Sequence, residues 1–362
     1  MNISDICAAA LSAGASDIHL KANKPPMIRV DGALKPISNS EPIPNEALGK
    51  LTWDIMSGPK RLEFKSNMEV DFALNLSELG RFRVNVFRQR GQIGVVLRVI
   101  PNKPPLLSEL TLPKVIKSLS ELSRGLVLLT GVTGSGKSTT LAAIIEEINR
   151  TRPAHIITIE DPIEFSFEDH CSLINQREIG SDSKSYPAAL RSAMRQDPDV
   201  ILISEIRDRE TMEIALTAAE TGHLVLASLH SINAPEAITR IVDFFDLNHQ
   251  SAIRHLLSGS LAAIVSQRLI SKREGGRVAA IEVMVNRGAV KECISSQERT
   301  KEIPDFLSKG TSQYGTQTFD QSLFWLAEDK IITVEEAIKN ATNAEDLELR
   351  FSGISSTEWI RP

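Results

Sequence analysis

The sequence has few cysteines, few aromatic residues and no long apolar run. Its three cysteines, Cys7, Cys171 and Cys293, stand far apart and form no CxxC pair, which argues against a zinc ribbon or a disulfide framework. No apolar run approaches the roughly 18 residues that span a bilayer, and the N-terminal segment carries Asp5 where a secretory signal has basic residues. We therefore expect a cytoplasmic protein, peripheral to a membrane only through protein partners.

The sequence also lacks a net positive charge. The formal net charge is -5, and aromatic residues make up only 5% of the chain, so the sequence offers little to attract or stack nucleic acid. Hydrophobic residues make up 42% and charged residues 24%, a composition typical of soluble globular proteins. For 362 residues, a length prior of about 150 residues per domain favours two domains.

Short alternating segments dominate residues 1–100. They follow a helical opening, are punctuated by Gly, Pro and Asn and are accompanied by two further helical stretches, so we expect a small α+β domain. The next segment, 101–109, holds three prolines, which favour extended backbone, and it is interpreted as an interdomain linker. The expected strands are 16–21, 27–32, 69–75, 80–90 and 92–100, and the expected helices are 45–56 and 59–66.

After the linker, fully apolar strands alternate with helices. This pattern predicts an α/β core over 110–235, with a sheet covered on both faces. Over 236–350 we expect a helical lobe with one hairpin at Gly275–Gly276, followed by a loose tail over 351–362. The expected core strands are 125–131, 155–160, 200–204 and 224–229, and the expected helices are 137–149, 208–221, 236–245, 250–266, 318–329 and 333–342.

The segment GVTGSGKST satisfies GxxxxGK(S/T) between a buried strand and an amphipathic helix, which is the context that a P-loop requires. Its glycines let backbone N–H groups curl around phosphate oxygens at the helix N-terminus. Lys137 then reaches the γ-phosphate of ATP, and Ser138 ligates Mg²⁺. A chance glycine-rich turn is the alternative, and the flanking strand and helix argue against it. The expected nucleotide contacts are Gly131, Thr133, Gly134, Ser135, Gly136, Lys137, Ser138 and Thr139.

Hydrolysis also needs a group that orients water and a second contact to the metal. Two acidic segments follow apolar strands, whose carboxyl ends meet ligands in sheets of this kind. TIEDPIEF contains Glu160, which we count among the nucleotide contacts, together with Asp161 and Glu164. LISEIRD contains Glu205. For Asp161 the alternative of a helix cap or an ion pair with Arg207 stays open.

Two histidines, His223 and His230, border the apolar strand 224–229. A histidine at a strand end is more often a satisfied structural residue than a catalytic one. Here both flank a strand beside the expected triphosphate site, which favours a γ-phosphate sensor or coupling role for His230.

Arginines cluster in the segment GRFRVNVFRQRGQIGVVLRVI. Arg81 and Arg83 alternate with apolar residues, so the two share one strand face. Arg88, Arg90 and Arg98 extend a positive stripe with them, although a solvated strand edge remains the alternative for any single arginine. Arg98 interrupts an apolar strand, where a guanidinium needs an anionic partner. In a ring of subunits, these side chains would reach a neighbour's nucleotide as arginine fingers.

Taken together, the motifs resemble those of the secretion-ATPase superfamily, and most closely the PilT-like type IV pilus retraction ATPases. The resemblance rests on ASDIHL, GRFRVNVFRQR, GVTGSGKSTT, TIEDPIEF, LINQREIG, RQDPDVILISEIRD and TGHLVLASLH, and it runs over nearly the whole chain. It implies a PAS-like N-terminal domain, a RecA-like ATPase domain with a helical C-terminal end, and a homohexamer with ATP between subunits. It also implies a motor for twitching motility that acts on an inner-membrane pilus platform protein.

The resemblance assigns roles to individual residues. Glu164 becomes the acid that activates water, and Glu205 becomes the atypical Walker B acid, which holds Mg²⁺ through water. Two segments depart from the family: Ser204 stands where a glycine is usual, and AVKECISS, residues 289–296, lacks the arginines and the final acid of the retraction motif. The His box falls on Thr221, His223 and His230, and the N-domain arginines on Arg81, Arg83, Arg88 and Arg98.

Three other functions stay open. A pilus-assembly or type II secretion ATPase usually carries a further N-terminal domain and a four-cysteine zinc insertion, neither of which this sequence contains. A paralogue that binds ATP weakly and modulates a partner motor is the second alternative, which a turnover assay separates. A nucleic-acid translocase is the third, and the net charge of -5 argues against it.

Overall fold

The structure is a computed structural model that describes residues 2–30, 32–38, 40–101, 103–354, 359 and 361. The chain divides into two compact units, Met1–Lys103 with Glu164–Ser166, and Pro104–Ile163 with Phe167–Pro362. The first change of unit therefore falls inside the proline-rich segment 101–109. Among the described residues, no helix combines the length and the apolar character needed to cross a bilayer.

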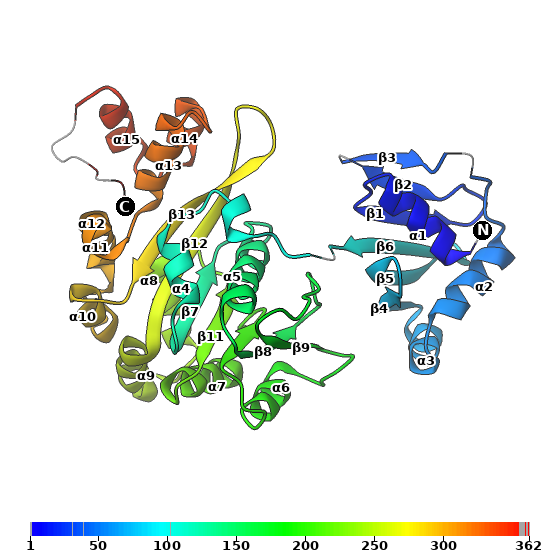
Figure 1. The fold of residues 1–362 in the computed structure, drawn as a ribbon, viewed down its shortest axis with the longest axis horizontal. Helices are drawn as coiled ribbons and strands as arrows, with labels where there is room; N and C mark the ends of the chain where they lie inside the picture. Colours follow the sequence, from blue (N-terminus) through cyan, green and yellow to red (C-terminus); the bar gives the residue numbers. More distant parts are fainter. Residues whose placement is uncertain are drawn as a thin grey trace. The chain divides into compact units, whose positions relative to one another are not determined.

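Over its described residues, the first unit contains one antiparallel sheet and three helices (Figure 1). Its strands are β1 (Asp17–Lys21), β2 (Met27–Val30), β3 (Ala33–Pro36), β4 (Glu69–Leu76), β5 (Gly80–Gln89) and β6 (Gln92–Ile100), and its helices are α1 (Ile3–Ser12), α2 (Asn45–Ile55) and α3 (Gly58–Asn67). The order in the sheet is β3-β2-β1-β6-β5-β4.

Alternation of side chains along the strands builds the core of this unit. In β5, Phe82, Val84 and Val86 are buried, because every second side chain of a strand points to the same face. They belong to one apolar cluster with Ile6 of α1 and Leu48 of α2. The expected strands and helices of this unit are all present, with residue 31 of the expected strand 27–32 lying outside the described residues, and β3 is additional. All four residues of β3 are exposed, so it has no apolar pattern by which it can be recognised.

The second unit is built on a seven-stranded sheet in the order β13-β12-β7-β11-β10-β8-β9. Its strands are β7 (Gly125–Thr130), β8 (His155–Glu160), β9 (Leu173–Glu178), β10 (Val200–Ile203), β11 (Leu224–Leu229), β12 (Leu261–Ser271) and β13 (Arg277–Val285). β13 runs antiparallel to β12, and the other neighbouring strands are parallel.

Helices cover both faces of this sheet (Figure 1). The helices that precede the hairpin are η1 (Leu107–Glu109), α4 (Val115–Ser120), α5 (Lys137–Thr151), α6 (Tyr186–Ala193), α7 (Arg209–Glu220), α8 (Ala234–Asp243) and α9 (Leu247–Ser260). Those that follow it are α10 (Ala289–Ser295), η2 (Thr300–Glu302), α11 (Ile303–Lys309), α12 (Thr311–Tyr314), α13 (Phe319–Glu328), α14 (Val334–Asn340) and α15 (Ala344–Phe351).

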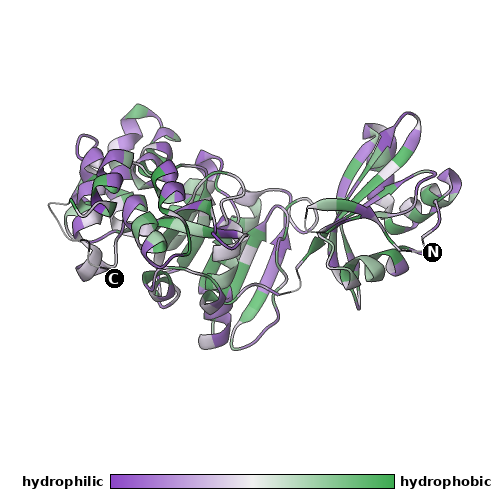
Figure 2. Cartoon of the chain, turned by 90° about the horizontal axis from the view of Figure 1, so that it is seen from above, coloured by the Kyte–Doolittle hydropathy of each residue, from purple (hydrophilic) through white to green (hydrophobic). Residues whose placement is uncertain are grey.

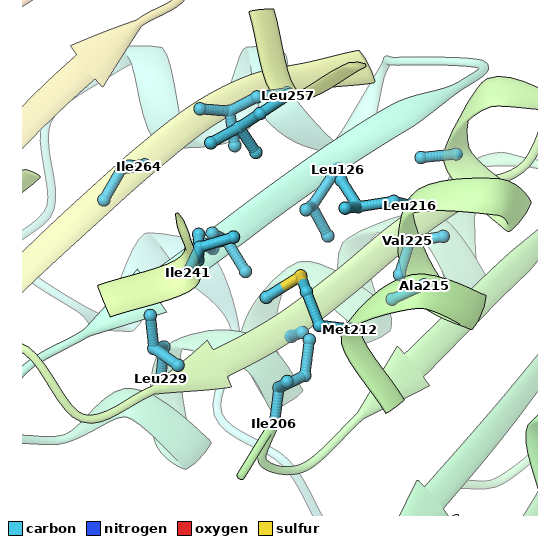
Figure 3. Close-up of a cluster of buried hydrophobic side chains, with 14 of the residues drawn as sticks. Leu126, Ile206, Met212, Ala215, Leu216, Val225, Leu229, Ile241, Leu257 and Ile264 are labelled. Atoms are coloured by element: carbon cyan, nitrogen blue, oxygen red, sulfur yellow. The ribbon is translucent and has the colours of Figure 1, made fainter. Parts of the chain in front are cut away.

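Strand β7 illustrates how the sheet holds both helical layers. Leu126 and Leu128 point into a cluster with residues of α7, α8 and α9, part of which Figure 3 shows around Met212 and Leu216. Val127 and Leu129 point to the other face, where they meet α4 and α5. In Figure 2 the hydrophobic colour is concentrated on the strands. A strand buried on both faces needs a continuous apolar run, and GLVLL provides it.

The structure corrects the expectation of a helix over 250–266. Helix α9 ends at Ser260, and residues 261–271 form β12. The hairpin at Gly275–Gly276 is confirmed, but its strands extend the main sheet instead of standing in a separate helical lobe. The segment LAAIV is buried on both sides of β12, and its pairing with β7 outweighs its helical appearance.

The C-terminal helices pack on the hairpin. Ile270 and Val278 form a cluster with residues of α13, α14 and α15. In the tail expected to be loose, Trp359 packs edge-on against Phe324 of α13, and Arg361 forms an ion pair with Asp329. Residues 355–358, 360 and 362 of that tail lie outside the described part of the chain.

Candidate active site

The loop between β7 and α5, residues 131–136, carries the phosphate-binding motif. At Gly131 the φ angle is 145°, and a Cβ there would lie 2.5 Å from the carbonyl oxygen of Gln267. Only glycine allows the loop to pass so close to β12. Gly134 and Gly136 also have positive φ angles, of 78° and 92°. The backbone therefore has the tight curvature with which successive N–H groups surround an anion.

Two buried polar side chains of this loop fit a phosphate ligand. Lys137 is only 8% exposed, and its ammonium donates to the carbonyl oxygens of Gly131 at 2.8 Å and Val132 at 3.0 Å. The hydroxyl of Ser135 is buried and has no hydrogen-bond partner within the described residues. A buried hydroxyl of this kind costs free energy until a ligand satisfies it. The residues present thus suit the phosphate tail of a nucleotide at the N-terminus of α5.

The remaining loop residues are more accessible. Ser138 and Thr139 lie half-buried in the first turn of α5, and Thr133 is exposed on the loop. The next residue, Thr140, is buried and accepts a hydrogen bond at 2.8 Å from the side-chain amide of Gln267. Gln267 therefore lies against both the start of the loop, with its carbonyl oxygen beside Gly131, and the first turn of α5, with its side chain at Thr140. Sequence reasoning missed it, although a glutamine within the apolar strand LAAIVSQRLI was a signal.

Glu205 follows strand β10 and lies between the side chains of Arg207 and His230. Its carboxylate accepts a hydrogen bond from Arg207 at 2.7 Å and lies 3.0 Å from Nε2 of His230. Partial burial alone would raise the pKa of Glu205, but the hydrogen bond from Arg207 and the proximity of His230 together lower it below its usual value. The following turn is fixed because Asp208 caps α7 by accepting from the N–H of Thr211 at 2.8 Å. Glu205 is thus a fixed anion.

The two histidines lie at opposite edges of the sheet. The register pairs Leu229 with Thr130 and Leu224 with Gly125, so His230 shares the edge at which the phosphate-binding loop begins. At about 3.3 Å per residue, His223 lies roughly 23 Å away from His230. Its carbonyl oxygen accepts from the N–H of Gly125 at 3.0 Å. The structure therefore does not bring His223, or Thr221 beside it, to the loop of the same chain.

Glu160 ends β8 at the same edge as Glu205. It is buried and accepts hydrogen bonds from the hydroxyl of Thr158 at 2.6 Å and from the side-chain amide of Gln176 at 3.1 Å. Glu160 is therefore held as part of the sheet. Asp161 and Glu164 lie in the irregular segment after β8 and are both exposed.

Ser204 and Tyr186 form a contact that sequence reasoning missed. Ser204, which departs from the family pattern, has its hydroxyl 2.5 Å from that of Tyr186. Its carbonyl oxygen also accepts a hydrogen bond from Ser228 of β11. The side chain of Ser204 is therefore engaged with helix α6.

The predicted arginines all lie in the first unit. Arg81 and Arg83 alternate with the buried residues of β5, as expected, and Arg83 pairs across the sheet with Arg98. Arg98 has the anionic partner that the sequence demanded, because its Nε lies 3.0 Å from the carboxylate of Asp17. Arg88 departs from the expected stripe: its guanidinium lies 5.8 Å from the ring centre of Phe64. Residue 88 has the parity of the buried residues of β5, so its side chain turns toward α3.

Comparison with known proteins yields close relatives. A family model described as type II/IV secretion system protein matches residues 1–324. The chain is 44% identical over 346 residues to the type IV pilus retractation ATPase PilT of Pseudomonas aeruginosa, covering 96% of this chain and 100% of that protein. It is 42% identical over 337 residues to the type IV pilus ATPase PilU of the same organism, covering 93% of this chain and 87% of PilU.

A solved structure supports the same grouping. The crystal structure of the pilus retraction motor PilT with bound ADP matches with a TM-score of 0.88 at 44% identity, over 96% of this chain and 99% of that one. The α/β fold expected from the sequence is thereby confirmed.

Proposed function

The chain belongs to the type II/IV secretion system protein family, and we propose that it is an ATP-hydrolysing motor that retracts a type IV pilus. One observation carries the proposal: the phosphate-binding loop, Glu160 and the Glu205–His230 pair share one edge of a single sheet. Such an edge places a loop that binds phosphates next to carboxylates that can bind a metal ion and orient water. Similarity to a pilus retraction ATPase over 96% of the chain supports retraction as the work performed.

We propose that ATP binds with Mg²⁺. Ser138, in the first turn of α5, and Glu205, acting through water, are the residues that would hold the ion, because Mg²⁺ prefers oxygen ligands and keeps several waters. The low pKa of Glu205, maintained by Arg207 against the effect of burial, keeps this ligand ionised at neutral pH. Mg²⁺ neutralises charge on the phosphates.

Glu164 is proposed as the residue that orients the attacking water and accepts its proton. Lys137 binds the phosphates, and His230 is proposed to respond to the presence of the γ-phosphate through its contact with Glu205. Loss of that phosphate would change the charge next to this pair, which is how a sensor couples hydrolysis to movement.

The assembly proposed is a homohexamer with nucleotide between neighbouring subunits. In such a ring Arg83 or Arg98 of one subunit would stabilise the negative charge that develops on the phosphates bound to its neighbour. Thr221 and His223, which lie far from the loop of their own chain, are proposed to act at the junction between subunits. Hydrolysis then rotates the N-terminal unit relative to the ATPase unit.

The proposed partners are an inner-membrane pilus platform protein and the rest of the pilus machinery, reached from the cytoplasmic side. A second candidate function deserves a test, because the chain is also 42% identical to PilU. The departures at Ser204 and at 289–296 favour this alternative, a paralogue that modulates a partner motor.

Two measurements test the proposal. Purified protein supplied with Mg²⁺ should release phosphate from ATP on its own, whereas a modulating paralogue would need its partner motor. Cells in which the gene is deleted should carry excess surface pili and lose twitching motility. Cells without pili would instead indicate assembly, and unchanged cells would contradict any role in pili.

A further inference from the structure

The edge strand β9, which contains most of the motif LINQREIG, has no role in the mechanism described so far. It runs parallel to β8, with Thr158 opposite Gln176 and Glu160 opposite Glu178. Alternate residues of a strand share a face, so these four side chains form one polar group across the two strands. Three of them are almost completely buried: Thr158 is 0%, Glu160 6% and Glu178 5% exposed. Buried polar groups of this kind persist only when hydrogen-bonded.

The hydrogen bonds of β9 reach the segment that follows β8. The side-chain amide of Gln176 donates to Glu160 at 3.1 Å, and its carbonyl oxygen accepts from the backbone N–H of Phe167 at 3.0 Å. The carboxylate of Glu178 accepts from the backbone N–H of Ile163 at 3.1 Å. The side chains of Gln176 and Glu178 thus fix the backbone at residues 163 and 167 by hydrogen bonds.

We propose that Gln176 and Glu178 are positioning residues that hold the loop bearing Glu164 in the geometry required for hydrolysis. The proposal rests on the function assigned above to Glu164. Only residues 164–166 lie between Ile163 and Phe167, the two residues whose backbone N–H groups are hydrogen-bonded to β9. Three residues span at most about 11 Å, so fixing both ends leaves the intervening backbone little freedom.

The same loop has a second attachment beyond Phe167. Asn149 near the end of α5 is fully buried. Its amide donates to the carbonyl oxygen of Glu168 at 2.8 Å, and its side-chain oxygen accepts from the N–H of His170 at 3.1 Å. Because α5 begins at Lys137, the loop that follows β8 is hydrogen-bonded to the same helix that carries the phosphate-binding lysine. Attachment to one rigid helix keeps a catalytic group at a constant distance from a bound phosphate.

The geometry separates chemistry from binding. The hydrogen bonds that carry this inference run from Gln176 and Glu178 to Glu160 and to the backbone N–H groups of Phe167 and Ile163, outside the phosphate-binding loop. Their loss should therefore leave nucleotide affinity intact. Displacement of a reacting group by about 1 Å is enough to slow a reaction by roughly 100-fold.

The test compares Gln176→Glu with Asn175→Asp. The first change places a carboxylate oxygen against Glu160 where an amide donated. The second makes the same chemical change one residue earlier, on the opposite face, where Asn175 meets His155 at 2.8 Å at the surface. For Gln176→Glu we expect kcat for ATP to fall roughly 10- to 100-fold, with the affinity for ADP changed less than about twofold. Asn175→Asp should retain both values.

Glu178 provides a second, independent variant in case Gln176→Glu folds poorly. Glu178→Gln keeps an oxygen that accepts from Ile163 and should retain most activity, whereas Glu178→Ala should lose it. A purely structural role predicts instead that kcat and ADP affinity fall together, in step with the loss of folded protein.

A double mutant distinguishes this inference from the proposed function. If Gln176 acts through Glu164, adding Gln176→Glu to Glu164→Gln should slow hydrolysis no further. Additive losses would overturn the inference and leave the role of Glu164 standing. Normal kcat in Glu164→Gln alone would overturn the role proposed for Glu164 itself, and normal kcat in Gln176→Glu alone would overturn only the positioning role.

Discussion

The hydroxyl of Tyr186 lies 2.5 Å from that of Ser204, which ties the first residue of helix α6 to the end of strand β10. Ser204 directly precedes Glu205, so this contact supports the backbone from which the proposed metal-binding acid projects. The serine departs from the family glycine, and the structure gives it a partner.

We expect that removing this contact weakens the fold. Ser204→Ala should lower the free energy of unfolding by about 1 kcal/mol, because Tyr186 loses a partner in a largely buried site. Ser204→Gly should cost about 2 kcal/mol, since glycine adds backbone entropy to the unfolded chain. Urea denaturation measures both, with the exposed Ser118→Ala as the control. Equal stability of all the variants would contradict the structural role.

Tyr186 should also give the fold a dependence on alkaline pH. Burial raises the pKa of Tyr186 to about 12, against the opposing effect of its hydrogen bond with Ser204. The folded state therefore favours the neutral phenol, and its contribution is complete below about pH 10 and lost as the pH rises toward 12. Tyr186→Phe should show a flatter loss of stability between about pH 9 and pH 11. Ser118→Ala, which removes no titratable group, is the control and should leave the slope as in the parent.

Lys137→Ala tests the phosphate-binding loop. The ammonium of Lys137 is buried against the carbonyl oxygens of Gly131 and Val132, and its loss removes the positive charge that meets the phosphates. We expect hydrolysis below detection and ADP affinity reduced by roughly 100-fold or more. Lys117→Ala, which removes an exposed lysine paired with Glu147 on the flank of α5, should retain both. Full ADP affinity and turnover in Lys137→Ala would exclude this loop as the ATP site.

Glu205→Gln should separate binding from hydrolysis. The amide keeps the size of the side chain but not the charge that Arg207 and His230 stabilise. Turnover should fall by roughly 100-fold while ADP still binds, as calorimetry and phosphate release would measure. Glu210→Gln, which breaks an exposed ion pair on α7, serves as the control. Because the pKa of Glu205 is lowered, any acid limb of the activity profile above about pH 5 should arise from another group.

Mixing experiments test whether an arginine acts on a neighbouring subunit. Arg83→Ala subunits mixed with Lys137→Ala subunits should recover part of the activity that each lacks alone, since one interface in the mixed ring keeps both residues. Arg98→Ala differs, because it leaves Asp17, itself little exposed, without its ion pair. It should destabilise the first unit by about 1–2 kcal/mol. No recovery with either arginine variant would place the charge that acts in trans elsewhere.

Local sequence patterns were enough for much of this architecture. The strand, loop and helix around Lys137 are contiguous, so their order could be recognised from one short segment. The same holds for β5, whose arginines and apolar residues alternate. By contrast, α9 runs directly into β12 with only Gly259 near the boundary, and the extended conformation of the next segment depends on pairing with β7.

The candidate site was less accessible to prediction, because its contacts join distant parts of the chain. Gln176 and Glu160 are 16 residues apart in sequence, and Gln267 and Thr140 are 127 apart. The sequence around one residue of each pair does not indicate which distant residue it contacts. The separation of His223 from His230, however, follows from the length of the strand between them, so the sequence alone was sufficient to place them at opposite edges.

Strand β12 lies outside the nucleotide-binding motif, but Gln267 connects it to that motif. Three residues further on, the same strand contributes Ile270 to the apolar cluster with α13, α14 and α15. Strand β12 therefore contacts the phosphate-binding region at Gln267 and the three C-terminal helices at Ile270. A continuous strand of this kind can couple a structural change at one contact to the other. We therefore expect the far C-terminal helices to register the exchange of ATP for ADP even though none of their side chains is assigned to the nucleotide.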